Sequence, residues 1–126
     1  MGYPERFVPI YTTGGKVEAF LVYPYIYSIS GDWIGWITRN RHVYSVHGHY
    51  VGWLSEDQRI LRKHTTAHIK PRLNPPPPPV KVDPPATKQM QAAALPELKV
   101  GTFDVLDEAP ELLPSVESDK SKEDQA

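Results

Sequence analysis

The chain repeats one stretch of its sequence: residues 26–37 read IYSISGDWIGWI, and residues 43–54 read VYSVHGHYVGWL. Of the twelve aligned positions, five are identical and five more exchange one apolar residue for another. The offset of 17 residues is too short for paired helical repeats, which need about 33 residues or more. The repeated unit therefore has to be built from strands and turns.

Each unit has the pattern of a β-hairpin. Residues 27–29 and 33–37 are rich in aromatic and β-branched side chains, which strands prefer. Between such runs, Gly31 and Gly48 stand where a tight turn needs a residue that tolerates positive φ. The sequence thus predicts an all-β fold, a meander of repeated short antiparallel hairpins over residues 7–64.

The return strands carry apolar side chains on both faces. With regular alternation, Trp33 and Ile37 are expected on one face of the sheet, and Ile34 and Trp36 on the other. A sheet with one wet face would instead alternate apolar with polar residues. We therefore expect the sheet to be covered twice, by closing on itself or by packing on another chain. A domain of this size rarely buries two faces alone, so a homo-oligomer is expected.

Composition divides the chain near residue 66. All three Trp, all seven Tyr and two of the three Phe precede residue 65, whereas eleven of the fourteen Pro follow residue 70. We predict a hairpin domain over residues 1–66. Residues 67–126 are expected to form a proline-rich, largely disordered tail.

Two parts of this tail could bind something. Residues 100–107 form a short apolar segment, in which Phe103, Val105 and Leu106 could dock on a partner or on the domain itself. The alternate spacing of Phe103 and Val105 suits strand addition to an exposed edge. The run of five prolines and the two residues after it also give the pattern Pro76-x-x-Pro79-x-Lys81, although any such run contains P-x-x-P.

Charge and cysteine content restrict the class of protein. Residues 1–66 carry seven Lys or Arg against five Asp or Glu, and the remainder carries seven against ten. Neither half has the dense basic surface typical of nucleic-acid binding. The chain has no Cys, no signal-peptide pattern and no apolar stretch long enough to span a membrane. We expect a cytoplasmic protein that contacts neither nucleic acid nor membrane.

Candidate catalytic and metal-binding residues are few. His47 and His49 could share a face as metal ligands, but they flank a turn glycine, and no third ligand is evident. Ser28 and Ser45 are expected to be cross-strand hydrogen bonders and not nucleophiles. There is no glycine-rich phosphate loop. We therefore predict no catalytic residue, no metal and no cofactor.

The repeated pattern resembles the small bacterial family of 4-fold β-flower proteins, including the proline-rich tail that follows. The residues that carry most of the resemblance are Gly31, Gly35, Trp36, Gly48, Gly52 and Trp53. The resemblance implies short hairpins arranged as petals around a four-fold or pseudo-four-fold axis. It implies no activity.

Two hypotheses about function follow from the sequence. The first is a non-enzymatic oligomeric scaffold or protein-interaction module whose tails reach a protein partner. The alternative is a carbohydrate or small-ligand binding module that uses the Trp and Tyr side chains as a platform.

Overall fold

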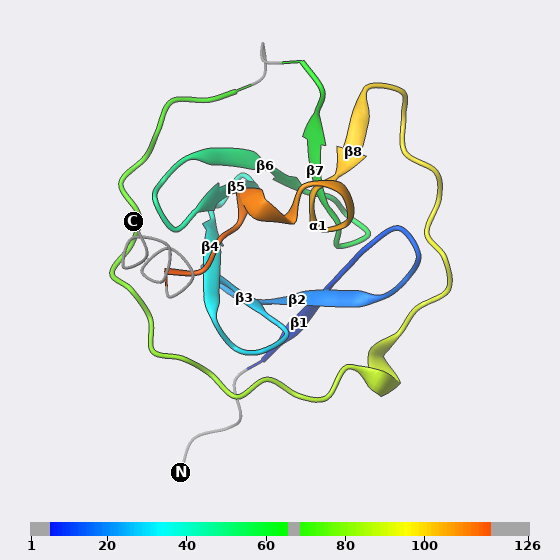
Figure 1. The fold of residues 1–126 in the computed structure, drawn as a ribbon, viewed down its shortest axis with the longest axis horizontal. Coiled ribbons are helices and arrows are strands. Elements are labelled where there is room, and N and C mark those ends of the chain that lie inside the picture. The colour runs from blue at the N-terminus through cyan, green and yellow to red at the C-terminus, as the bar shows by residue number, and fades with distance from the viewer. Residues whose placement is uncertain (1–5, 66–68, 117–126) are drawn as a thin grey trace, which may run out of the picture.

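The computed structural model describes residues 6–65 and 69–116, which form one eight-stranded antiparallel sheet in sequence order. The strands are β1 (Val8–Tyr11), β2 (Val17–Val22), β3 (Tyr25–Ser28), β4 (Trp33–Ile37), β5 (His42–Ser45), β6 (Tyr50–Leu54), β7 (Ile60–Lys63) and β8 (Thr102–Asp104). Single turns of helix are η2 (Lys88–Met90), α1 (Val105–Glu108) and η3 (Pro110–Leu112). The sheet curls into a half-barrel (Figure 1), so the predicted all-β meander is confirmed.

Five tight loops of the meander share one construction. In each, the carbonyl of a Ser or Thr accepts a hydrogen bond from the amide three residues later, and its own amide donates to the carbonyl four residues later. The residue three positions on has φ between 66° and 89°. This is the geometry of a three-residue hairpin loop with a left-handed residue at its end. The initiating residues are Thr12, Ser28, Thr38, Ser45 and Ser55.

Side-chain hydroxyl groups hold these loops. The Oγ of Ser28 accepts from the amides of Ser30 and Asp32, and the Oγ of Ser45 accepts from those of His47 and His49. From the sequence these two serines are expected to bond across strands. They bond within their own turns instead, because each stands at the last position of its strand, where the loop amides converge on it.

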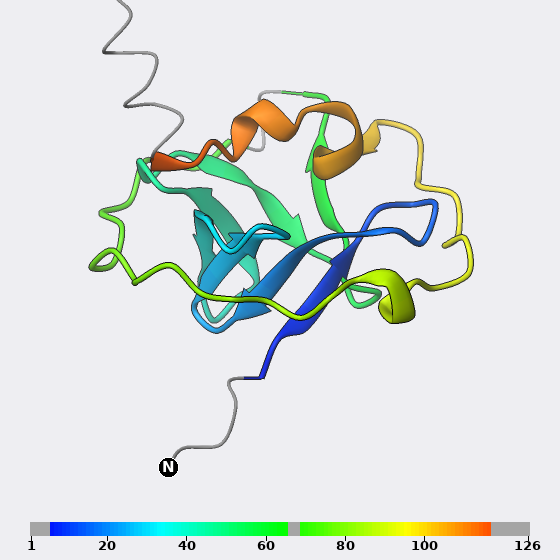
Figure 2. The same cartoon turned by 60° about the horizontal axis from the view of Figure 1, so that its bottom comes forward.

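The fourth hairpin, β7 with β8, contains a long insertion. The other three hairpins that share its end of the sheet have tight loops, each with a glycine at φ near 88°: Gly15, Gly31 and Gly48. Gly101 has φ 87° and directly precedes β8, but the chain between residues 64 and 101 stands in place of a tight loop. We call residues 69–99 the strap, because they circle the outside of the sheet (Figures 1 and 2).

The strap and the last strand change the expected domain boundary. A division at residue 66 would separate β7 from β8, yet Leu61 pairs with Asp104 and Lys63 with Thr102. The sheet therefore takes a strand from the expected tail. Residues 69–116 are described along the domain, and the disorder expected for the tail as a whole stays a prediction. The end of that predicted tail, residues 117–126, lies outside the described residues.

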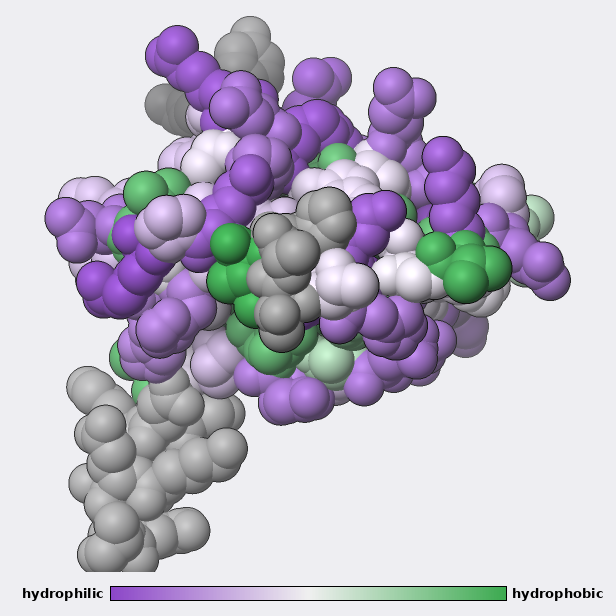
Figure 3. Space-filling model, turned by 90° about the horizontal axis from the view of Figure 1, so that it is seen from above, coloured by the Kyte–Doolittle hydropathy of each residue, from purple (hydrophilic) through white to green (hydrophobic). Residues whose placement is uncertain are grey.

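The strap supplies a second cover for the sheet. Figure 2 shows it passing around the side of the half-barrel, while α1 and η3 lie across one mouth. The face in Figure 3 is mostly hydrophilic, with hydrophobic residues in separate patches. Part of the apolar outer surface is thus covered by the chain itself.

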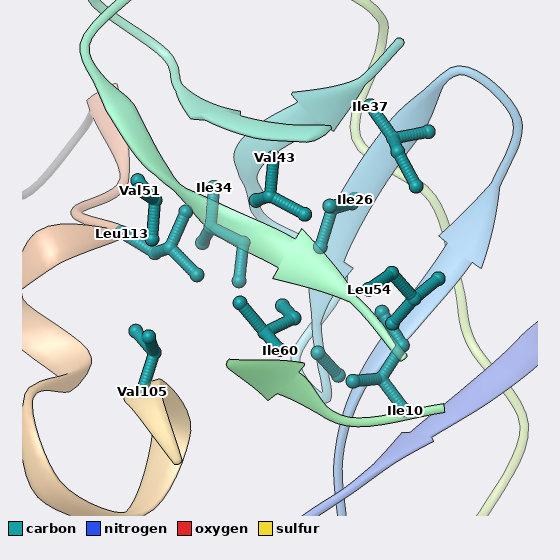
Figure 4. Packing of buried hydrophobic residues seen from close by; sticks show 11 residues of the cluster. Ile10, Ile26, Ile34, Ile37, Val43, Val51, Leu54, Ile60, Val105 and Leu113 are labelled. Carbon is teal, nitrogen blue, oxygen red and sulfur yellow. The ribbon is translucent and has the colours of Figure 1, made fainter. Parts of the chain in front are cut away.

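The core fills the inside of the half-barrel with aliphatic side chains (Figure 4). Its buried members are Ile10, Ala19, Ile26, Ile34, Ile37, Val43, Val51, Leu54, Ile60, Val105 and Leu113. Val105 and Leu113 come from the C-terminal segment and point at the sheet. Each fully buried aliphatic side chain of this kind contributes about 1.5–3 kcal/mol through burial.

The sides of the sheet on which side chains lie differ from those predicted, because the hairpins β1–β2, β3–β4 and β5–β6 each contain a bulge. Each bulge shifts the strand register by one residue, so regular alternation is broken. Ile34 and Ile37 both join the core, whereas Trp33 and Trp36 both lie outside it. β6 repeats this arrangement. The half-barrel therefore has an aliphatic inside and an aromatic outside, which strict alternation cannot produce.

Candidate functional site

Aromatic side chains form two clusters on the outer face, with ring centroids 5.0–6.4 Å apart. The first contains Tyr25, Tyr27 and Trp33, and the second contains Trp36, Tyr44, Tyr50 and His42. Burial raises the pKa of Tyr44. Burial, followed by the effect of Tyr44, raises the pKa of Tyr50, although Arg62 opposes this. Burial and then Lys70 lower the pKa of His42.

The proline run of the strap lies on the first cluster. The Oη of Tyr25 donates a hydrogen bond of 2.7 Å to the carbonyl of Pro77. Pro75, Pro76 and Pro79 of the run are half-buried, whereas Pro77 and Pro78 are exposed. A polyproline II helix has three residues per turn, so prolines three apart face the same side. Pro76 and Pro79 fit such a helix lying with one edge on the surface, whereas Pro75 is half-buried outside this period.

A charged pair follows the proline run. The Nζ of Lys81 lies 3.5 Å from a carboxylate oxygen of Asp32, in the β3–β4 loop. A hollow of about 270 Å³ lies here, and its lining residues are Asp32, Trp33, Pro78, Pro79, Lys81, Ser115 and Val116. Both charges are partly exposed, at 63% for Lys81 and 29% for Asp32, so the pair contributes little to stability.

The strap is also attached to three hairpin loops by backbone hydrogen bonds. The amides of Leu73, Val82 and Ala92 donate to the carbonyls of the loop glycines, at 3.0, 3.3 and 2.9 Å. In this order the acceptors are Gly48, Gly31 and Gly15, so the strap meets the hairpins in reverse sequence order. A Cβ atom on these glycines would lie 1.9–2.2 Å from a strap carbonyl oxygen. Only glycine lets the strap come this close.

A polar cluster joins the first hairpin to the last strand. Oδ2 of Asp104 accepts hydrogen bonds from the amide and hydroxyl of Thr13, at 2.7 and 3.0 Å. Arg59 is buried beside them and donates to Thr13, to the carbonyl of Pro96 and to the carboxylate of Asp57. These contacts, with the bond from the Tyr11 amide to the carbonyl of Gln58, link the two ends of the open sheet.

The pKa values of the two carboxyl groups in this cluster are shifted in opposite directions. Hydrogen bonds from Arg59, assisted by Ser55, lower the pKa of Asp57 against the effect of burial. Burial raises the pKa of Asp104, and the charge of Asp107 adds to this, while hydrogen bonds from Thr13 and the Asp107 amide oppose it. Oδ1 of Asp104 is buried and has no hydrogen-bond partner among the described residues.

A comparison with protein families matches residues 8–103, which include all four hairpins and the strap, to the family of 4-fold beta flower proteins. The chain belongs to this family. No curated protein and no solved structure matches it. The resemblance expected from the repeat is thereby confirmed. We call the eight-stranded sheet the flower and its four hairpins, β1–β2, β3–β4, β5–β6 and β7–β8, the petals (Figure 1).

The repeat residues of the flower hold backbone contacts. Gly31 and Gly48 receive the strap, as described above. Gly35 and Gly52 lie under neighbouring strands: a Cβ on Gly52 would lie 1.9 Å from the carbonyl oxygen of Leu61. Trp36 is buried and donates from Nε1 to the carbonyl of Ser45.

Of the side chains expected to form a platform for a sugar ligand, Trp33, Tyr50 and Trp53 are half-buried and Trp36 is buried. Trp36 is 8% exposed, and Tyr27 and Tyr44 are each 3% exposed. Trp53 is half-buried, with the Nζ of Lys63 5.9 Å from the centre of its ring. The rings that the sequence offers for stacking therefore contact this flower's own side chains.

The three predicted docking residues contact the flower itself. Val105 is fully buried in the core, and Phe103 and Leu106 pack against that core. The ring of Phe103 also lies 4.8 Å from that of His64. A partner could reach Val105 only by displacing the segment that carries it.

Several site residues escape reasoning from the sequence. Tyr25 and Asp32 sit in or beside the repeat, but nothing local indicates that the proline run returns to them. The P-x-x-P-x-K pattern is the one available signal, and its partner is visible only in the fold.

Among the residues that the structure describes, no group of three His, Asp or Glu side chains could hold a metal ion. In the same residues, no helix has the length and hydropathy to cross a bilayer.

Proposed function

We propose that the flower is a non-enzymatic protein-interaction module whose outer aromatic face binds polyproline segments of other proteins. The observation that carries the proposal is the hydrogen bond from Tyr25 to the carbonyl of Pro77, beside Trp33, under a proline run. The flower's own strap occupies the face as a ligand within the same chain.

The chemistry of this contact is that of polyproline recognition in general. A polyproline II helix makes no internal hydrogen bonds, so its carbonyls are free to accept bonds from a protein. It is also extended before it binds, so little conformational entropy is lost. Aromatic side chains provide flat apolar surface for the proline rings, and a Tyr hydroxyl provides the donor. Tyr25 and Trp33, whose ring centroids lie 6.1 Å apart, supply these two elements.

A partner peptide has to compete with the strap. The strap is held within the same chain, which gives it an effective concentration in the millimolar range. Binding to the intact protein is therefore expected to be weak, and a variant with a weakened strap is needed to measure it. Pro76→Ser combined with Pro79→Ser removes two of the three half-buried prolines of the run and leaves Tyr25 and Trp33 in place. We call this protein the strap variant.

The test measures binding of a labelled peptide with the sequence of residues 75–83, PPPPPVKVD, by fluorescence anisotropy. We expect saturable binding to the strap variant and weaker binding to the intact chain. Adding Tyr25→Phe to the strap variant should weaken binding about threefold to tenfold, the value of one hydrogen bond. Tyr23→Phe is the matched control, because Tyr23 is 60% exposed and should leave binding unchanged.

Two results would contradict the proposal. One is a folded strap variant, with native near-ultraviolet circular dichroism, that binds no peptide at millimolar concentration. The other is equal binding of this peptide and of one with every proline replaced by alanine. A glycan array on the same proteins tests the carbohydrate alternative, which predicts a signal that Trp53→Ala removes.

A further inference from the structure

We propose that Asp32 makes the polyproline site selective for ligands with a cationic side chain two residues after the second proline of P-x-x-P. This inference rests on the proposed function and names the partner more closely: a segment of the form P-x-x-P-x-Lys or P-x-x-P-x-Arg. The strap itself has this form, with Pro76, Pro79 and Lys81.

Three contacts set the register of the strap on the second petal. The carbonyl of Pro77 accepts from Tyr25, the ammonium group of Lys81 faces Asp32, and the amide of Val82 donates to the carbonyl of Gly31. Two of these involve the ligand's backbone, so many sequences could make them. The contact at position 81 is the one that depends on the ligand's side-chain charge.

Asp32 is held in place by its own turn. Its amide donates to the Oγ of Ser28 at 3.2 Å, and its carbonyl accepts from the amide of Ser28 at 2.8 Å. The carboxylate group is thus presented from a fixed backbone, next to the glycine that binds Val82. A ligand anchored at Gly31 has to place the preceding side chain near this carboxylate group.

The other petals lack this charge pairing. At each loop glycine, a strap amide donates to the glycine carbonyl. We compare the strap residue that precedes this amide with the loop residue that follows the glycine. The matched pairs are Lys81 with Asp32, Arg72 with His49, and Gln91 with Lys16. Opposite charges are matched only at the second petal among these three. The selectivity is therefore a property of the β3–β4 loop and not of the glycine contacts.

Direction is the second property that Asp32 would control. A polyproline II helix presents similar carbonyls and ring faces when read from either end, so prolines alone specify direction weakly. A single cation on the C-terminal side of the prolines removes this ambiguity. Because the pair is exposed, we expect a modest gain of about threefold in affinity, which should decrease in high salt.

The experiment compares three peptides on the strap variant by fluorescence anisotropy at low and high salt. The peptides are PPPPPVKVD and the same sequence with Met or Glu in place of Lys. We expect affinities in the order Lys, Met, Glu. Asp32→Asn should bring the Lys and Met peptides to equal affinity, and Asp32→Lys should reverse the order of Lys and Glu. Asp32→Asn preserves the side-chain size and leaves both backbone bonds to Ser28 possible.

The outcomes separate the two proposals. Equal affinity of the three peptides for the protein with Asp32 would overturn the selectivity and leave the proposed function intact. An unchanged preference for Lys on Asp32→Lys would do the same. Failure of all three peptides to bind the folded strap variant would overturn both.

Discussion

The carboxyl group of Asp104 connects the last strand to the first petal, and only 1% of this residue is exposed. Its raised pKa means that folding favours the protonated form. In the unfolded chain the group ionises near its ordinary value of 3.8, so the folded state binds more protons above that pH. Stability contributed by this group therefore falls as pH rises from the unfolded pKa through the folded one.

Replacing Asp104 by Asn tests this at the scale of one residue. An amide keeps an oxygen that can accept from Thr13 and does not ionise. The variant should therefore gain stability relative to the natural chain as pH rises from 3.8 through the raised pKa of Asp104. Urea unfolding at several pH values measures the difference. Asp83→Asn, at an exposed strap residue, is the control and should show no such trend. A constant difference for Asp104→Asn would contradict the raised pKa.

Single residues were predictable where the reason is local. The turn glycines Gly31 and Gly48 follow from the repeat, because a tight hairpin needs positive φ at that point. The partners of Tyr25 and Asp32 were not predictable, because they lie on the strap, far along the chain. Nothing in the sequence near Asp104 indicates that it would meet Thr13.

At the scale of elements, two separate constraints act on the loop glycines: a positive φ and close contact with the strap. Gly48 needs positive φ and also lies against the carbonyl of Leu73. Gly101 needs positive φ, but a methyl group added there would have nothing within 4 Å. Gly14 has neither constraint. These three positions form a graded series in one chain.

Alanine at each position should give three different losses of unfolding free energy. Gly14→Ala should change it by less than about 0.5 kcal/mol. Gly101→Ala should cost about 1–2 kcal/mol through backbone conformation alone. Gly48→Ala should cost about 2–5 kcal/mol, because the added methyl group also displaces the strap. Chemical denaturation measures all three. Equal losses at Gly48 and Gly101 would mean that the strap does not press on the β5–β6 loop.

The sequence predicted the strands of the meander well, but it did not predict which side chains of the return strands face the core. Period and composition predicted the hairpins, but the bulges changed the expected sides of the return strands. A bulge depends on how two strands pair, which residue spacing within one strand does not record. Strand addition by residues 100–107 was one of the sequence-based alternatives, and β8 does pair with β7. The sequence did not indicate β7 as the partner, because the whole strap separates the two strands.

For the whole molecule, self-association remains a prediction. It followed from apolar side chains on both faces of the sheet, and the strap now accounts for part of the second cover. Light scattering of the full chain at micromolar concentration tests it. A mass that is a multiple of 14.3 kDa is expected, whereas a single mass of 14.3 kDa would exclude a stable oligomer.

The strap is attached to the petals of its own chain through the backbone amides of Leu73, Val82 and Ala92. Hydrogen exchange of these three amides, measured by NMR, reports whether the strap is bound. If the strap is bound, these three amides should exchange at least about tenfold more slowly than the amide of Val80, a residue that is 82% exposed. Exchange of all three at the rates of a free peptide would show that the strap is not bound.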